Sequence, residues 1–486
     1  MTLSFDDTKY EIKEITQKDE TITVRAFEHI PYCVSPLDPM LERLSVYAPE
    51  ALFHGEKING YGIEDAPIFM PNTVGGYMPG PEEAPGPNFM GEINASFHAI
   101  KRGYVVVSAG ARGRGCKGLN GENVGIAPAG LVDLKAAVRF IRFNKDSMPG
   151  DTEKIITNGT SAGGAMSALL GSTGNHPDYN KYLEEIGAAD ERDDVFASSC
   201  YCPITNLENA DIAYEWEFNG INDYHRMMIE ETENGIADHP DLLGKPDGMP
   251  PKPPKFVPVN GELNNDQKRI SDELCEKFPE YLNNLSLRDA NGEKLSLNAD
   301  GDGSFLDMIK GNILKSAQST LDHGKDILNE SGVSNWLSVE NGKAVAIDWK
   351  RFVLYRTRMK EAPAFDNVSM GTAENELFGS DRIKERHFTS FSKENDTAGG
   401  ALAEEGQIKL MNPMNYIEDD SAVKAKHFRI RHGAVDRDTS LAISEILNQK
   451  LVNAGIDSEI AHPWGIPHSG DYDLPEMFAW IDSICK

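Results

Sequence analysis

The stretch KIITNGTSAGGAMSALLG, residues 154–171, decides the fold class. It joins a short apolar run to a run of small residues typical of a closely packed helix, and Ser161 stands at the junction within Gly-x-Ser-x-Gly-Gly. This arrangement is called a nucleophile elbow: the strand turns so sharply into the helix that the central side chain is exposed on a strained backbone. The flanking glycines are required because a Cβ would collide with neighbouring backbone. The pattern therefore predicts a nucleophilic serine, and the alternative is a glycine-rich strand-to-helix turn in which the serine has no catalytic role.

Predicted strands and helices alternate on both sides of this stretch. Segments 10–15 and 21–27 are predicted to form a hairpin, and the run YVVVSAGARG at 104–113 predicts a buried strand. A helix with apolar residues at helical spacing follows, with Asp133 as its predicted N-cap. Near the C-terminus the predicted order is strand, helix, strand, helix at 426–433, 439–455, 456–465 and 474–485. This alternation predicts an α/β protein with a mostly parallel sheet flanked by helices, and together with the elbow it predicts the α/β-hydrolase fold.

The middle of the chain has a different character. Residues 203–407 contain a proline cluster at 249–258, acidic helical stretches and polar loops, and they contain no run like VVVSAG. We expect a large, mainly helical lid inserted into the fold at 203–407, with the core formed by 1–202 and 408–486.

A serine nucleophile needs a base, and the base needs an acid that fixes its tautomer. In this fold the partners follow in the order Ser, Asp or Glu, His. The histidines of the last segment are His462, at the end of a predicted strand, and His468, in a glycine-containing loop. The loop position favours His468 as the base, whereas a packed role suits His462.

The acid is less sharply defined, because Asp436 and Asp438 are two residues apart in RHGAVDRDTS. If the segment is extended both face one side; if it turns, one holds the histidine while the other faces the substrate. Asp438 could also be a carboxylate at a helix N-terminus. The pattern gives Asp436 a small advantage as the acid.

An oxyanion hole requires two N–H donors. One is expected from Ala162, directly after the nucleophile, and the other from Gly75 or Gly76 in the loop after an early strand. An ordinary glycine turn is the alternative for Gly75 and Gly76.

The sequence predicts no metal site and no cofactor. Asn298-x-Asp300-x-Asp302-Gly303 resembles part of a calcium loop, but Ile309 stands where the bidentate glutamate belongs, so a polar turn is favoured. Arg112 and Arg114 could contact an anionic substrate, although loop salt bridges suit them better. The six cysteines are sparse and irregularly spaced, and their even number is weak evidence for disulfides. Cys200 and Cys202 have no second Cys/His pair for a zinc knuckle, so they are expected to be core thiols.

The formal charge of −29 argues against a nucleic-acid partner, because phosphates would be repelled. No apolar run is long enough for a membrane helix and no signal peptide is visible, so we expect no membrane partner and a cytoplasmic location. The sequence does not indicate an oligomeric state.

Three segments in the same order, NGTSAGGAMS, RHGAVDRDTS and PHSGDYD, resemble the bacterial tannases (tannin acyl hydrolases) over essentially the whole chain. The resemblance implies hydrolysis of gallate and protocatechuate esters, small phenolic substrates, by Ser161, Asp436 and His468, and it resolves the choice between the aspartates. It also implies that Lys360 in KEAPAFD, Glu374 in ENELFG and Asp438 contact the galloyl hydroxyls. Carboxylates accept from such hydroxyls and an ammonium donates to them; without the resemblance, Lys360 and Glu374 would be read as solvated lid charges.

Other functions fit the elbow as well. A feruloyl or general carboxylesterase would accept methoxylated or aliphatic acyl groups, and serine peptidases also use Gly-x-Ser-x-Gly-Gly elbows. A non-catalytic binding module of the same fold usually lacks a triad member, whereas this chain has candidates for all three.

Overall fold

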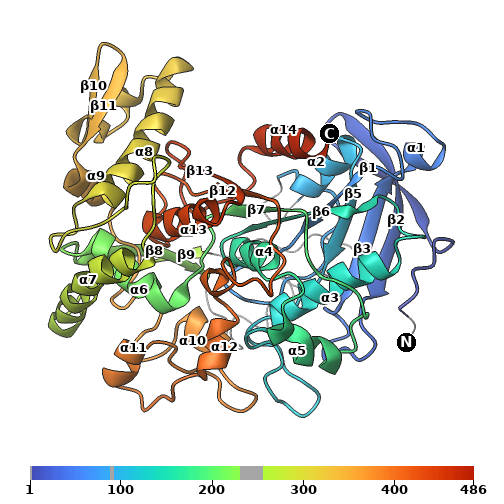
Figure 1. Ribbon diagram of the computed structural model, residues 1–486, viewed down its shortest axis with the longest axis horizontal. Coiled ribbons are helices and arrows are strands. Elements are labelled where there is room, and N and C mark those ends of the chain that lie inside the picture. The colour runs from blue at the N-terminus through green and yellow to red at the C-terminus, as the bar shows by residue number, and fades with distance from the viewer. Residues whose placement is uncertain (1–2, 88–91, 230–255) are drawn as a thin grey trace.

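The computed structural model describes residues 3–87, 92–229 and 256–486, which form a central sheet covered by helices (Figure 1). The nine strands of the sheet lie in the order β1-β2-β3-β5-β4-β6-β7-β12-β13. Their bounds are β1 Glu11–Gln17, β2 Glu20–Pro31, β3 Arg43–Pro49, β4 Pro67–Pro71, β5 Val105–Ala109, β6 Asp151–Thr160, β7 Ala197–Tyr201, β12 His427–Arg431 and β13 Asp457–Ala461.

The sheet is antiparallel at one end and parallel elsewhere. β1, β2, β3 and β5 pair antiparallel in turn, and β1 and β2 form the predicted hairpin, with Glu11 opposite Ala26 and Gln17 opposite Glu20. From β5 through β4, β6, β7 and β12 to β13 all pairs are parallel. Every residue of β5 and of β7 is buried, as expected of parallel strands covered on both faces. The predicted fold class is confirmed.

Helices cover both faces of this sheet (Figure 1). α2 (Ala95–Lys101) packs with the C-terminal α14 (Leu474–Cys485), while α3 (Ala129–Phe143) packs with α4 (Ala162–Ser172) and α5 (Asn180–Glu185). The short α1 (Glu50–Phe53) follows β3, and α13 (Leu441–Asn453) lies between β12 and β13 in the chain and packs on β13.

The prediction that Asp133 caps a helix is wrong. Helix α3 begins at Ala129, and Asp133 lies inside it, fully buried. Its carboxylate accepts hydrogen bonds from the backbone N–H of Arg112 at 2.6 Å and from the Arg112 guanidinium at 2.7 Å. Asp133 therefore forms a buried ion pair with Arg112 instead of capping a helix, and the local sequence gives no sign of this partner.

The part of the insertion that the structure describes is mainly helical but also holds two hairpins that do not join the central sheet. The hairpins pair β8 (Asp223–Ile229) with β9 (Phe256–Glu262), and β10 (Leu337–Glu340) with β11 (Lys343–Ile347). The helices are α6 Leu207–Phe218, α7 Asn265–Leu285, α8 Ser304–Asp322, α9 Trp349–Arg356, α10 Ala373–Leu377, α11 Ser390–Glu394 and α12 Glu405–Lys409. Most of the proline cluster at 249–258 lies outside the described residues. The division at 203 and 407 stays a prediction.

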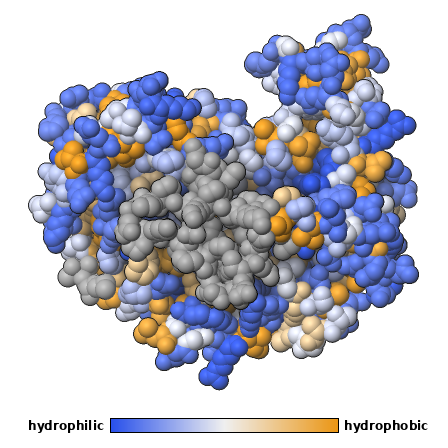
Figure 2. Space-filling model, turned by 180° about the vertical axis from the view of Figure 1, so that it is seen from behind, coloured by the Kyte–Doolittle hydropathy of each residue, from blue (hydrophilic) through white to orange (hydrophobic). Residues whose placement is uncertain are grey.

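The surface is largely hydrophilic on the face shown in Figure 2. No helix in the described ranges is both long and apolar enough to cross a bilayer.

Candidate active site

Ser161 occupies the sharp turn between β6 and α4. Its backbone has φ 62° and ψ −123°, a strained combination for a residue with a Cβ, and its N–H donates to the carbonyl of Tyr201 at 2.9 Å. A Cβ on Gly159 would stand 2.3 Å from the carbonyl oxygen of Gly163, and one on Gly164 would stand 2.5 Å from that of Tyr201. These close approaches confirm the steric reason for the glycines of the motif.

The loop that carries Gly75 and Gly76 lies against this turn. The Asn72 side chain, just before it, donates to the carbonyls of Asn158 at 3.0 Å and Gly163 at 3.1 Å. The space beside Gly75 is open, since a Cβ there would meet nothing within 4 Å. The N–H of Ala162 lies in the first turn of α4, where helical N–H groups have no acceptor within the helix. The structure thus brings the predicted oxyanion donors to the same side of the sheet as Ser161.

Arg114 fixes the backbone of this loop. Its Nε donates to the carbonyl of Gly76 at 2.7 Å, and its backbone N–H donates to the carbonyl of Tyr77 at 2.8 Å. The guanidinium also pairs with Glu376 of α10, which Lys384 contacts at 2.7 Å. Arg114 and Arg112 both form salt bridges within the protein, the role that suits them better than contact with an anionic substrate.

Asp436 and His468 meet at the carboxyl ends of the last parallel strands. The Nδ1 of His468 lies 2.8 Å from Oδ2 of the fully buried Asp436, whose Oδ1 accepts from the N–H of Asp438 at 2.8 Å. The segment therefore turns, and the two aspartates have different partners. The His468 side chain is 25% exposed, so its outer edge is accessible.

The His468 loop packs directly on the elbow. A Cβ on Gly470 would stand 1.8 Å from Oγ1 of Thr160, the residue before the nucleophile candidate. The Asn158 side chain donates to the Asp471 carboxylate at 3.0 Å, which ties the same loop to β6. Residues far apart in the chain are thereby held at one site.

His462 has the packed role that its position suggested. It is fully buried, with Nε2 2.8 Å from the Glu445 carboxylate and Nδ1 2.9 Å from the carbonyl of His432. His432, which the sequence analysis did not single out, places its Nε2 3.3 Å from Oδ2 of Asp436.

The charges of the pair stabilise each other. Burial raises the pKa of Asp436, but the neighbouring imidazoles of His468 and His432 hold that pKa well below its usual value. Burial lowers the pKa of His468, but the Asp436 carboxylate, with smaller contributions that include Asp438, brings it well above the usual value. An ionised aspartate that stabilises an imidazolium is what a triad base requires.

A second polar group adjoins this pair. The Lys360 ammonium lies 3.0 Å from Oδ1 of Asp438 and 3.9 Å from the centre of the Phe365 ring. Burial raises the pKa of Glu374, while the Lys360 charge acts against this rise, so the two side chains are electrostatically coupled. Burial also raises the pKa of Asp438, but Lys360 and His468 lower it below its usual value. The structure thus pairs Lys360 with Asp438, and this pair interacts electrostatically with Glu374 and, through Asp438, with His468.

Two further residues support the site without a signal in the local sequence. The Arg356 guanidinium, fully buried, donates to the backbone carbonyl of Asp436 and pairs with Glu217 of α6. Cys202, read as a core thiol, is buried, but its Sγ lies 4.0 Å from Nε2 of His468. Each of these two residues contacts the site through a partner from a distant segment of the chain, Asp436 for Arg356 and His468 for Cys202.

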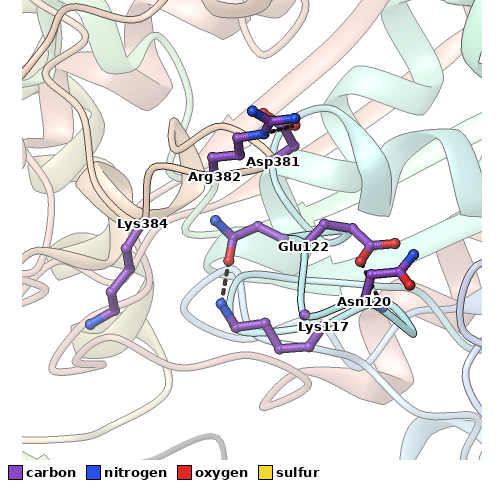
Figure 3. Close-up of a pocket in the computed structure, with 8 residues that line it drawn as sticks. Lys117, Asn120, Glu122, Asp381, Arg382 and Lys384 are labelled. Atoms are coloured by element: carbon purple, nitrogen blue, oxygen red, sulfur yellow. Dashed lines mark hydrogen bonds and ion pairs between the residues drawn. The ribbon is translucent and has the colours of Figure 1, made fainter.

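The two remaining polar features do not belong to this site. Asn298 Oδ1 accepts from the N–H of Asp300 at 3.0 Å and of Asp302 at 3.2 Å, as in the polar turn favoured above. A surface cavity of about 510 Å³ includes none of the predicted site residues (Figure 3). Its Lys117 already pairs with Asn123, and its Lys384 with Glu376. Its lining consists of Lys117, Asn120, Gly121, Glu122, Asn123, Asp381, Arg382 and Lys384.

Comparisons with known proteins show similarity to ester hydrolases. The family model described as BD-FAE matches residues 75–246. Esterase LipC of Mycobacterium tuberculosis is 43% identical over 58 residues, which are 12% of this chain and 14% of that esterase. The chain therefore spans only a small part of this curated relative.

Similarity to solved structures extends over the whole chain. The tannase of Fusobacterium nucleatum is 45% identical with a TM-score of 0.92, and the match covers 100% of both chains. The tannase of Lactobacillus plantarum is 43% identical, also with a TM-score of 0.92 and full coverage of both. A tannin acyl hydrolase in complex with ethyl gallate is 41% identical, with a TM-score of 0.88 over 100% of this chain and 99% of that one. With this identity over its full length, the chain belongs to the bacterial tannases, a family of carboxylic ester hydrolases with the α/β-hydrolase fold.

Proposed function

We propose that this protein hydrolyses esters of gallate and related hydroxybenzoates, with Ser161, His468 and Asp436 as its catalytic triad. The observation that carries the proposal is the 2.8 Å contact between His468 Nδ1 and the buried Asp436, on a loop that packs against the strained Ser161 turn. A tannin acyl hydrolase in complex with ethyl gallate and another with 3,4-dihydroxybenzoate are similar over the whole chain, which supports this acyl class.

The reaction proceeds by acyl transfer to water. Ser161 Oγ attacks the ester carbonyl while His468 Nε2 accepts its proton, and the Asp436 carboxylate stabilises the resulting imidazolium. The oxyanion is held by the N–H of Ala162 and that of Gly75 or Gly76. His468 then protonates the leaving alcohol, and a water molecule activated by His468 releases the acid from Ser161.

The polar group beside the triad selects the acyl ring. Two or three adjacent hydroxyls of a hydroxybenzoyl ring match the mixed donors and acceptors offered by Lys360, Glu374 and Asp438. Without substrate, the Lys360–Asp438 pair satisfies these charges internally. A ring without hydroxyls would leave the buried charges without hydrogen bonds from the substrate, which is the basis of strong discrimination.

A panel of esters tests both halves of the proposal. We expect turnover of methyl gallate to exceed that of methyl ferulate and of p-nitrophenyl butyrate, because only gallate presents three adjacent hydroxyls. Preference for ferulate or the aliphatic ester would instead indicate a feruloyl or general carboxylesterase, and cleavage of a chromogenic peptide panel would indicate a peptidase.

Replacing Ser161 tests whether it is the nucleophile of a catalytic triad or a serine without a catalytic role. The Ser161→Ala variant should lose about 10⁴-fold or more in kcat for methyl gallate, as other triads do. Turnover by the folded variant within about tenfold of wild type would contradict the role of Ser161.

A further inference from the structure

Cys202 occupies an unusual position at the site. It follows β7 directly, its φ of 34° lies in a region that side-chain-bearing residues seldom adopt, and its N–H donates to the carbonyl of Arg431 at 2.6 Å. Its Sγ contacts the Ser469 carbonyl at 3.4 Å and lies 4.0 Å from Nε2 of His468. The proposed ester chemistry uses His468 but gives the thiol no task.

Cys202, His468 and Asp436 form a group of potential metal ligands. Their ligand atoms lie within 4.8 Å of one another, and no other group of three or more such side chains is found in the described part of the chain. Since Nδ1 of His468 already faces Asp436 at 2.8 Å, the nitrogen directed to the thiol is Nε2. A metal-binding histidine almost always donates its second N–H to a carboxylate, a backbone carbonyl or water, so Asp436 can orient the ring for a metal as well as for the proposed catalysis.

The gap between sulfur and nitrogen has a suitable width. Zinc binds cysteine sulfur at about 2.3 Å and histidine nitrogen at about 2.0–2.1 Å. With these bond lengths, the 4.0 Å separation of Cys202 Sγ and His468 Nε2 corresponds to a sulfur–zinc–nitrogen angle of about 130°, between tetrahedral and linear.

The ligand types select the class of cation. A thiolate with an imidazole favours thiophilic cations such as Zn²⁺ and Cd²⁺, whereas Mg²⁺ and Ca²⁺ prefer oxygen ligands. Binding releases the thiol proton to solvent as the metal–sulfur bond forms. The cation would also occupy the Nε2 lone pair with which His468 accepts the serine proton.

We propose that Cys202 and His468 form an inhibitory site for a thiophilic divalent cation. The claim that the cation binds is based on the contacts above, while the claim that it inhibits rests on the proposed role of His468 as the base. Gallate esters would be poor reporters of inhibition, because adjacent hydroxyls chelate metals themselves. The rate at which a fluorophosphonate probe labels Ser161 avoids this competition.

The experiment combines this labelling rate with the ultraviolet thiolate-to-cadmium absorption band, using the full-length protein. We expect Cd²⁺ to produce the band and to slow labelling of the wild type at least about tenfold, and Mg²⁺ to do neither. Cys275→Ser, which removes a partly buried thiol of α7, is the matched control and should behave as wild type. Cys202→Ser should need at least about 100-fold more Cd²⁺ for half-inhibition of its own labelling rate, since a direct ligand counts for more than its outer partner.

Binding of the cation can be tested apart from catalysis. His468→Ala should weaken the Cd²⁺ band at equal Cd²⁺, a readout that needs no activity. Absence of a band in the wild type, a band unchanged in Cys202→Ser, or equal half-inhibition of Cys202→Ser and wild type would each overturn the proposal. If the band depends on Cys202 and His468 but methyl gallate is not hydrolysed, the proposed function fails while the metal site stands.

Discussion

Removal of the Arg114 side chain should impair catalysis although Arg114 touches no substrate in the proposed reaction. Its Nε holds the carbonyl of Gly76 at 2.7 Å, and its guanidinium connects that loop to Glu376 of α10. Without the arginine, the Gly75–Gly76 loop loses a contact that holds its backbone in place for the proposed binding of the oxyanion. We therefore expect the Arg114→Ala variant to lose kcat with little change in KM.

The size of the loss follows from the contacts. A hydrogen bond from a charged donor stabilises its partner by about 1.5–3 kcal/mol, which corresponds to a change of about 10- to 150-fold in the population of the fixed loop. Complete loss of one oxyanion donor costs about 10²–10³-fold in kcat and sets the upper limit. For Arg114→Ala we expect kcat for methyl gallate to fall by about 10- to 100-fold.

The matched control is Lys384→Ala. Lys384 contacts the same Glu376 at 2.7 Å and Glu385 at 3.2 Å instead of Gly76, and its side chain is 69% exposed. An exposed pair of this kind contributes about 0.2–1 kcal/mol, so kcat should stay within about threefold of wild type. Thermal unfolding of both variants checks that the fold is intact. If folded Arg114→Ala keeps kcat within about threefold of wild type, Arg114 does not position the oxyanion loop.

Three further changes test other parts of the site. Asp438→Ala should raise KM for methyl gallate far more than for methyl benzoate, and equal effects on both would show that Asp438 does not read the ring hydroxyls. Because His468 must be neutral to act as base and its pKa is raised, kcat/KM should fall with decreasing pH at a midpoint above 6.5. The Asp438→Asn variant removes a negative charge near His468 and should move that midpoint to lower pH. An unmoved midpoint would contradict the electrostatic coupling between Asp438 and His468. Gly163→Ala places a Cβ 2.6 Å from the Asn72 side chain and should destabilise the fold by about 1–3 kcal/mol, whereas Gly311→Ala in α8 meets nothing within 4 Å and should not lower the melting temperature.

The sequence was most informative where one short segment contains the whole physical reason. The Ser161 elbow needs only a strand, a helix and glycines, and all three are adjacent in the chain, so both the fold class and the steric role of Gly159 and Gly163 could be predicted. The buried strand at 104–113 was equally clear, because continuous β-branched residues mark a parallel strand covered on both faces.

Prediction failed where a distant partner decides the local role. β7 was not recognised, because ASSCY at 197–201 is small and polar, yet it is buried between β6 and β12. Asp133 looked like a helix cap until Arg112 was found to pair with it. The supporting contacts of Cys202 and Arg356 likewise depend on residues more than 70 positions away. None of these pairings leaves a trace in local periodicity.

The turn that holds the proposed triad acid depends on the insertion as well as on the sheet. Arg356 at the end of α9 donates to the Asp436 carbonyl, and its partner Glu217 in α6 accepts from Ser440 at 2.6 Å and from the N–H of Leu441 at 2.9 Å. The backbone on both sides of Asp438 is thereby tied to helices of residues 203–407. Because Asp438 N–H in turn donates to Asp436, a shift of these helices would disturb the proposed acid and the proposed ring-binding residue Asp438 together. The insertion is therefore better understood as a structural part of the catalytic site than as a cover that could be removed without loss of the triad.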